Sequence, residues 1–240
     1  MKKAYLLILI TIAGFTWGLS SCRFGCVKGS GHVVSEVRKL NDFSKIDISG
    51  LFKIILKQDS TLNLSVSADD NLIKYIKTNV SGNKLHISTG NKNICNVGEM
   101  VITIGVHDLE AIKSSGAVEI STDGKLVTKN LHFDLSGIAK VNMELNAANV
   151  STEGSGATDV TLRGQASSHN INLSGGGKIH AFDFVVGNYN IESSGASECE
   201  INVLHELNVK SSGASSIKYK GNPASVNNNK SGVSSITKVE

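Results

Sequence analysis

The chain has 240 residues, of which 40% are hydrophobic, 5% aromatic and 19% charged, and its formal net charge is +3. Gly, Ser and Asn together make up almost a third of the residues, whereas proline occurs once. Disordered chains this rich in small polar residues carry more proline and charge, so the composition predicts a folded protein of many short strands and turns. A near-neutral chain without a cluster of Lys and Arg excludes electrostatic binding of nucleic acid.

The first residues are typical of an export signal. Lys2 and Lys3 precede an apolar, acid-free run at 4–18, which is too short to cross a bilayer comfortably. The run ends in Leu-Ser-Ser-Cys, the pattern of a bacterial lipobox, whose cysteine thiol takes a diacylglycerol. We therefore predict a lipoprotein signal peptide at 1–21, lipidation of Cys22 and a membrane anchor with its tether at 22–30. An ordinary cleaved signal with a chance cysteine is the alternative.

Residues 31–110 read as an N-terminal β section. Alternating apolar residues predict strands near 33–37, 52–56, 62–68, 85–88 and 100–106. Between the third and fourth, Asp69 and Asp70 precede the sequence LIKYI, which predicts one or two helical turns with an aspartate as N-cap. No Pro-rich or charged linker follows, so we expect this section to continue directly into residues 111–240.

Three cysteines remain if Cys22 is lipidated, and an oxidising compartment then permits one internal disulfide. Cys199 alternates in phase with apolar Ile201 and Val203, as a small buried residue does. Spacing alone does not choose the pair. Cys26 and Cys95 both lie in turn-rich stretches, and we predict that they are the bonded pair. No cysteine forms the C-x-x-C pattern of a zinc or redox site.

The second half of the chain is a repeat. Ser-Gly recurs at spacings of 18 to 21 residues, with the glycines at Gly116, Gly137, Gly156, Gly175, Gly195, Gly213 and Gly232. The preceding residues are Ser115, Ser136, Ser155, Ser174, Ser194, Ser212 and Ser231. Apolar residues alternate on both sides of each glycine, which predicts strand, corner, strand, with a positive φ at the glycine. The period of about 19 predicts an all-β solenoid whose coils cannot bury their apolar faces alone.

Stacked coils would place the serines above one another, so their hydroxyls could form a ladder. A serine nucleophile needs a base and a strained elbow, and no G-x-S-x-G occurs among these copies. We interpret the serine row and the glycine corners as structural.

The chain resembles the bacterial autotransporter adhesin, head GIN domain family. The resemblance runs from CVKGSGHVVSEVRKLNDFSKIDISG at Cys26, through SADDNLIKYIKTNVSGNKLHIST, to the SGA-type repeats and YKGNP at 219–223. It implies export, frequent lipid anchoring and a right-handed parallel β-helix-like solenoid, as in the envelopes of Bacteroidetes. It also supports the Cys26–Cys95 pairing and implies no catalytic residues.

No motif points to a metal, a cofactor or a phosphate. The histidines are scattered without ligand spacing, and we interpret them as ordinary surface or strand residues: His32, His86, His107, His132, His169, His180 and His205. The Gly-rich stretches at 29–31 and 175–177 lack the Lys-Ser/Thr and helix of a phosphate cradle. Carboxylates that could serve a polysaccharide lyase or hydrolase are Asp134, Glu144, Glu153, Asp159, Asp183, Glu192, Glu198 and Glu200.

We therefore expect a non-catalytic, lipid-anchored envelope protein at the outer membrane, on its periplasmic or its surface face. Its partner would be an envelope polysaccharide or a protein, held through extended solenoid faces. The alternatives are a polysaccharide-active enzyme and a regulatory envelope component recognised by another protein. An exposed ridge of in-register Asn, Thr and Ser would favour adhesion, and a compact exposed apolar patch would favour recognition by a protein.

Overall fold

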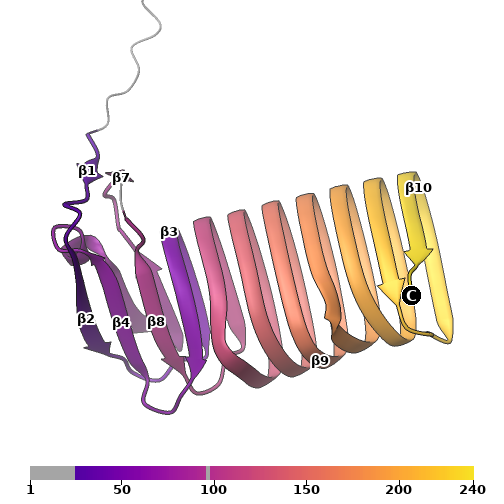
Figure 1. Ribbon diagram of the computed structural model, residues 1–240, viewed down its shortest axis with the longest axis horizontal. Helices are drawn as coiled ribbons and strands as arrows, with labels where there is room; N and C mark the ends of the chain where they lie inside the picture. The colour runs from indigo at the N-terminus through magenta and orange to yellow at the C-terminus, as the bar shows by residue number, and fades with distance from the viewer. Residues whose placement is uncertain (1–24, 96–97) are drawn as a thin grey trace, which may run out of the picture.

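The structure, a computed structural model, describes residues 25–95 and 98–240, so the predicted signal peptide and Cys22 lie outside the described residues (Figure 1). The strands are β1 (Val27–Lys28), β2 (Val33–Lys39), β3 (Lys45–Gln58), β4 (Asn63–Asp69), β5 (Lys77–Ser81), β6 (Lys84–Ser88), β7 (Ile94–Cys95), β8 (Val101–Val106), β9 (Ala111–Lys220) and β10 (Ser225–Lys238). The prediction of an all-β fold is confirmed. Within the described ranges, no helix is long and apolar enough to cross a membrane.

Strand β3 joins the two sections. On one edge it pairs in parallel with β6 and β8, and on the other it pairs in parallel with the first turn of β9. Gly50 divides it at a corner and lies in register with Gly116. The repeat therefore begins one coil earlier than the sequence analysis placed it.

The N-terminal section is a mixed sheet rather than a set of parallel coils. β4 runs antiparallel to both β2 and β8, and β5 runs antiparallel to β6. The predicted strands all occur here, and three short ones, β1, β5 and β7, were not predicted. A tight turn at Gly82 and Asn83, both with positive φ, joins β5 to β6.

The predicted helical turn is a single 3₁₀ turn, η1 (Ile73–Tyr75), and the aspartate N-cap is wrong. No side chain caps the turn, because the Asp70 carboxylate instead accepts a hydrogen bond from Ser30 Oγ at 2.6 Å. The Asp69 carbonyl oxygen accepts the Leu72 N–H at 2.8 Å.

From residue 111 the chain winds into successive coils that stand side by side along the long axis (Figure 1). Every second residue points inward, and the inward residues of all coils join one apolar core that extends from Phe43 to Ile217. The largest buried side chains of the coils are Phe133, Phe184 and Tyr189. Each coil buries its apolar residues against its neighbours, because a single coil cannot enclose a core.

The repeat glycines lie against one another at the corners. Their φ angles are all positive, from 80° at Gly137 to 130° at Gly195. A Cβ on any of them would overlap the carbonyl oxygen of the glycine one coil earlier; at Gly156 it would lie 2.5 Å from the Gly137 oxygen. Only glycine fits such a corner, since both the positive φ and the backbone contact exclude a side chain.

The last coil, formed by β10, closes the stack. It pairs in register with the end of β9, but it places Asn228, Lys230 and Lys238 opposite Val209, Ser211 and Tyr219 of the preceding coil. Polar residues at otherwise inward positions make the open edge unattractive to a further strand.

Candidate functional site

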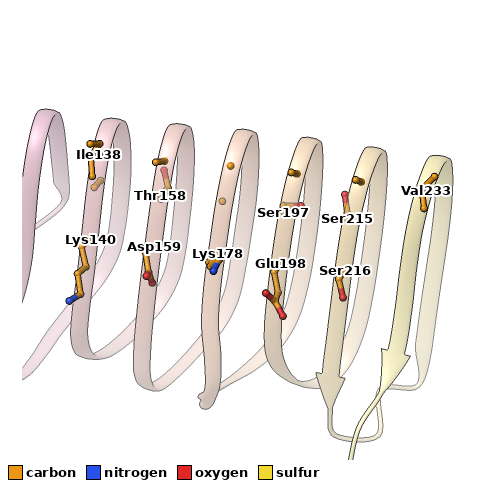
Figure 2. Close-up of a pocket in the computed structure, with 16 residues that line it drawn as sticks. Ile138, Lys140, Thr158, Asp159, Lys178, Ser197, Glu198, Ser215, Ser216 and Val233 are labelled. Atoms are coloured by element: carbon orange, nitrogen blue, oxygen red, sulfur yellow. The ribbon is translucent and has the colours of Figure 1, made fainter.

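Two outward surfaces of the coils are distinctive, and the first is a groove beside the glycine corners, which we call the corner groove. Its cavity of about 820 Å³ runs across six coils (Figure 2). The residue after each glycine forms its upper rim: Ile138, Ala157, Gly176, Ala196, Ala214 and Val233. The groove exists because the four central rim residues are small and only the two ends carry larger side chains. A further hollow of about 300 Å³ continues it past Ile138 to Leu51.

A row of charged side chains lies below this rim. Lys140, Asp159, Lys178 and Glu198 each stand three residues after a repeat glycine, and they line the groove side by side (Figure 2). The charges alternate in sign from one coil to the next. Neither lysine of the row takes part in an ion pair within the part of the chain that the structure describes.

Beside this row, the structure brings together several residues that the sequence analysis had weighed separately. His180 Nδ1 lies 3.0 Å from Glu200 Oε2, and its Nε2 lies 3.9 Å from Asp159 Oδ1. Lys218 Nζ bonds both Glu198 and Glu200, at 3.2 and 3.4 Å. The hydrogen bonds from His180 and then Lys218 hold the pKa of Glu200 below its usual value. None of the hydrogen bonds of this cluster reaches a hydroxyl or thiol nucleophile, so we interpret it as a surface ion-pair network.

The second surface lies on the strands that precede the glycine corners, and we call it the Asn–Ser face. Five residues before successive glycines stand Asn170, Asn190, Asn208 and Asn227. The Nδ2 of each of the last three donates to the asparagine Oδ1 of the preceding coil, at 2.8 to 2.9 Å. A shorter ladder joins Asn130, Asn149 and Ser168 at 2.8 Å. The ladders fix the amide planes and leave one amide hydrogen per rung free for a ligand.

The Asn–Ser face also holds hollows lined by polar side chains. Asn172 and Asn229, three residues before their glycines, line a cavity of about 320 Å³ around the Lys210–Glu192 ion pair. Both asparagines are exposed, and neither amide has a hydrogen-bond partner among the described residues. These two side chains are therefore available to an incoming polar ligand.

The predicted serine row faces outward on this surface. Ser115 and Ser136 donate to the carbonyl oxygens of Ile48 and Ser114 one coil back, at 3.4 and 2.9 Å. The remaining five, Ser155, Ser174, Ser194, Ser212 and Ser231, are exposed. Over the described ranges the row forms no hydroxyl ladder, because the first two serines donate to backbone oxygens and the other five face solvent.

Cys26 and Cys95 are joined in a disulfide with their Cα atoms 5.7 Å apart. The bond holds β1 beside β7. β7 belongs to the loop that connects β6 to β8, at the place where β3, which pairs with both, has its corner at Gly50. Cys199 is a buried free thiol, and burial raises its pKa to about 12. A thiol held protonated in the core is not a nucleophile.

His169 does not fit the interpretation as an ordinary surface or strand histidine, because it is fully buried. Its Nε2 lies 2.9 Å from Thr152 Oγ1, and its ring packs between Phe184 and Tyr189. Burial lowers its pKa to about 3. The sequence pattern could have predicted this burial, since His169 alternates in phase with the buried apolar residues Ile171 and Leu173.

Two of the carboxylates weighed for glycoside cleavage line a common hollow. Asp134 and Glu153 line one small hollow of about 150 Å³, but the Lys113 ammonium donates to Asp134. No group of three His, Cys, Asp or Glu side chains within residues 25–95 and 98–240 could hold a metal ion.

Comparisons with known proteins place this architecture in a family. The family model described as "Putative auto-transporter adhesin, head GIN domain" matches residues 42–223. A crystal structure of a putative adhesin from Bacteroides fragilis NCTC 9343 is 25% identical, with a TM-score of 0.82 over 89% of this chain and 100% of that one. No curated protein matches the chain.

Two further solved structures share the fold alone. One is a putative adhesin from Parabacteroides merdae ATCC 43184, 19% identical, with a TM-score of 0.61. The other is a putative lipid binding protein from Parabacteroides distasonis ATCC 8503, 21% identical, with a TM-score of 0.63. Each match covers 89% of this chain and 99% of the other. With its repeat matched almost throughout, the chain belongs to the auto-transporter adhesin, head GIN domain family.

Proposed function

We propose that the protein is a non-catalytic, adhesin-like component of the cell envelope that binds an extended polar polymer, such as an envelope polysaccharide, along its Asn–Ser face. The observation that carries this proposal is the register of that face. Asparagine and serine side chains recur at equivalent positions of successive coils, with the asparagine amides bonded to one another.

Such a face offers many equal and individually weak contacts. Neighbouring strands are about 4.8 Å apart, so donors and acceptors repeat at a short and constant interval. A polymer with hydroxyl groups at a similar interval can bond to several coils at once. No deep pocket or buried charge is needed, because linked weak contacts multiply in avidity.

The coils behind this face form, in our proposal, one right-handed parallel β-helix-like solenoid. Its support is the parallel register of β3 and β10 with β9, together with the glycine contacts from coil to coil. A solenoid of this kind is rigid along its axis, so it presents the rows in a fixed arrangement to a long ligand.

The proposal includes a lipid anchor at Cys22. Cys26 follows Cys22 by four positions, so the tether between them spans at most about 14 Å and would hold the N-terminal section close to the membrane. We expect metabolic palmitate labelling of the wild type and none of Cys22→Ala. Continued labelling of Cys22→Ala would exclude this anchor, whatever the binding face does.

Polymer binding is tested with purified protein on immobilised envelope and host polysaccharides. We expect retention by at least one polymer, weakened about tenfold in Asn172→Ala/Asn229→Ala because both free amides lose their hydrogen bonds. Asn142→Ala is the matched control, since this exposed asparagine follows its glycine corner, whereas the residues of the Asn–Ser face precede theirs. Equal loss in both variants, or no retention by any polymer, would contradict the proposal.

A further inference from the structure

The corner groove exposes apolar side chains that nothing in the described part of the chain covers. Val233 is 84% exposed, Ile138 64% and Leu51 50%. All three stand directly after a corner glycine, so they line one edge of the molecule. Ile138 and Val233 stand at the two ends of the groove, and the small rim residues between them continue it as one apolar strip across six coils. An exposed apolar strip of this extent indicates contact with a protein rather than with solvent.

The charged side chains that line the groove alternate in sign along the stack of coils. Three residues after successive glycines, from Gly50 to Gly195, stand Lys53, Glu119, Lys140, Asp159, Lys178 and Glu198. The sign alternates at every coil. A polymer with charges of a single sign would meet repulsion beside each attraction, so the row does not fit nucleic acid or an acidic polysaccharide.

The alternation does not serve ion pairs within the row. Lys53 pairs with Glu99 at 3.5 Å, Asp159 with His180 at 3.9 Å and Glu198 with Lys218 at 3.2 Å. Across the described ranges, no ion pair joins one member to the next, and Glu119, Lys140 and Lys178 have none. The row therefore presents charges outward, where a partner can meet them.

An alternating row has the property that reading it backwards exchanges every sign. Over the four central members of the row, from Lys140 to Glu198, a second copy of the same chain turned by 180° therefore meets each lysine with an acid and each acid with a lysine. We propose that the corner groove and its charge row form a self-association surface, on which two copies lie antiparallel about a twofold axis between the Gly156 and Gly175 coils. Lys140 then faces Glu198 of the second copy, and Asp159 faces Lys178 of the second copy.

The shape of the groove agrees with the same axis. It places the exposed Ile138 opposite Ala196 of the second copy, one of the small rim residues, so that a large side chain meets a hollow. Val233 then faces Leu51 of the second copy. Eight coils overlap over a length of about 34 Å. A strip this shallow belongs to the weak class of interfaces, so association depends on protein concentration.

The test is sedimentation velocity of the purified protein over a range of concentration and salt. We expect a monomer–dimer equilibrium that weakens as salt screens the charges. Two variants make the row uniform: Lys140→Glu/Lys178→Glu makes it acidic, and Asp159→Lys/Glu198→Lys makes it basic. Each alone should dimerise about tenfold less than the wild type because like charges face one another, whereas an equimolar mixture should form heterodimers.

The control is Lys129→Glu/Lys230→Glu, which changes net charge as much as the acidic variant does but away from the groove. It should dimerise like the wild type, and thermal melting should show that every variant is folded. A wild type that stays monomeric at all concentrations overturns the proposal, as does a mixture that associates no better than its components. Polymer binding by the Asn–Ser face is unaffected by either result, because its test residues lie on the other surface.

Discussion

The N-terminal section and the coil stack both depend on glycine corners, but in different ways. Gly82 turns the chain from β5 to β6 with φ of 57°, and a Cβ added to it would have no other atom within 4 Å. Gly156 has φ of 104°, and a Cβ added there would lie 2.5 Å from a backbone oxygen of the preceding coil. The first glycine serves a local turn, whereas the second serves the contact between coils.

The two sections also differ in what holds them together. The N-terminal section contains antiparallel pairs, of which β5 and β6 are joined by a short turn, and a disulfide joins β1 to β7. The coils of residues 111–238 contain no disulfide, and they depend on parallel pairing and on burial against the neighbouring coil. The effect of a destabilising substitution should therefore remain local in the N-terminal section, whereas in the coil stack it should spread to the neighbouring coils.

The largest expected effect is that of Gly156→Val. A β-branched residue at this φ is strained, and its Cβ would also push apart the Gly137 and Gly156 coils, so we expect a loss of more than about 4 kcal/mol in the free energy of unfolding. Urea denaturation measures it. Gly82→Asn, at a φ that asparagine tolerates and with open space around it, should cost less than about 1 kcal/mol. Similar losses in the two variants would remove the distinction between the sections.

Removal of the disulfide should weaken the N-terminal section. The bond closes a separation of 69 residues, so Cys26→Ala/Cys95→Ala should lose up to about 4 kcal/mol in the chain-entropy model. Hydrogen exchange is the measurement: amides of β2 and β4 should exchange faster, while those of the coils after residue 130 keep their protection. Faster exchange throughout the coils would show that the sections unfold as one unit.

A smaller and pH-dependent effect is expected from His169 in the coil core. Its pKa is about 3 when folded and about 6.5 when unfolded, so below pH 6.5 the unfolded chain binds a proton that the folded chain does not. The stability contribution of neutral His169 is therefore complete above pH 6.5 and declines as pH falls toward 3, by about 3 kcal/mol at pH 4.

His169→Phe/Thr152→Val removes the titrating group together with its hydrogen-bond partner. Urea unfolding of this variant should show a shallower fall in stability between pH 7 and pH 4 than the wild type shows. Equal slopes in the two proteins would mean that the folded chain protonates His169 as readily as the unfolded chain does.

The sequence predicted the parts of the fold that follow from the spacing of the repeat glycines and from the alternation of apolar and polar residues along the strands. The seven stacked glycines from Gly116 onward were found because their spacing is nearly constant. The eighth stacked glycine, Gly50, was missed because it stands 66 positions before Gly116, far more than one repeat. The asparagine ladder and the alternating charge row were visible in the same alignment, five residues before and three residues after the glycine.

Other features depend on contacts that one sequence does not encode locally. Whether β4 runs antiparallel to β8 is decided by packing between strands that lie far apart in the chain. The groove likewise arises only when small rim residues from several coils stand side by side. The hydroxyl ladder was expected from the stacking alone, but the serines face outward, where backbone oxygens and water compete for them.

The central claim is that binding is spread along repeated coils rather than concentrated in one catalytic centre. Titration calorimetry with oligosaccharides of increasing length, cut from a polymer that the protein retains, tests this claim most directly. The account predicts that affinity rises with each added sugar unit until the ligand spans the Asn–Ser face. This face extends about 34 Å from the Ser49 coil to the Ser231 coil. The account also predicts that the protein releases no reducing or unsaturated sugar ends. Affinity that is complete at the shortest oligomers, or sugar ends released by the wild type and abolished by one Asp or Glu substitution, would contradict it.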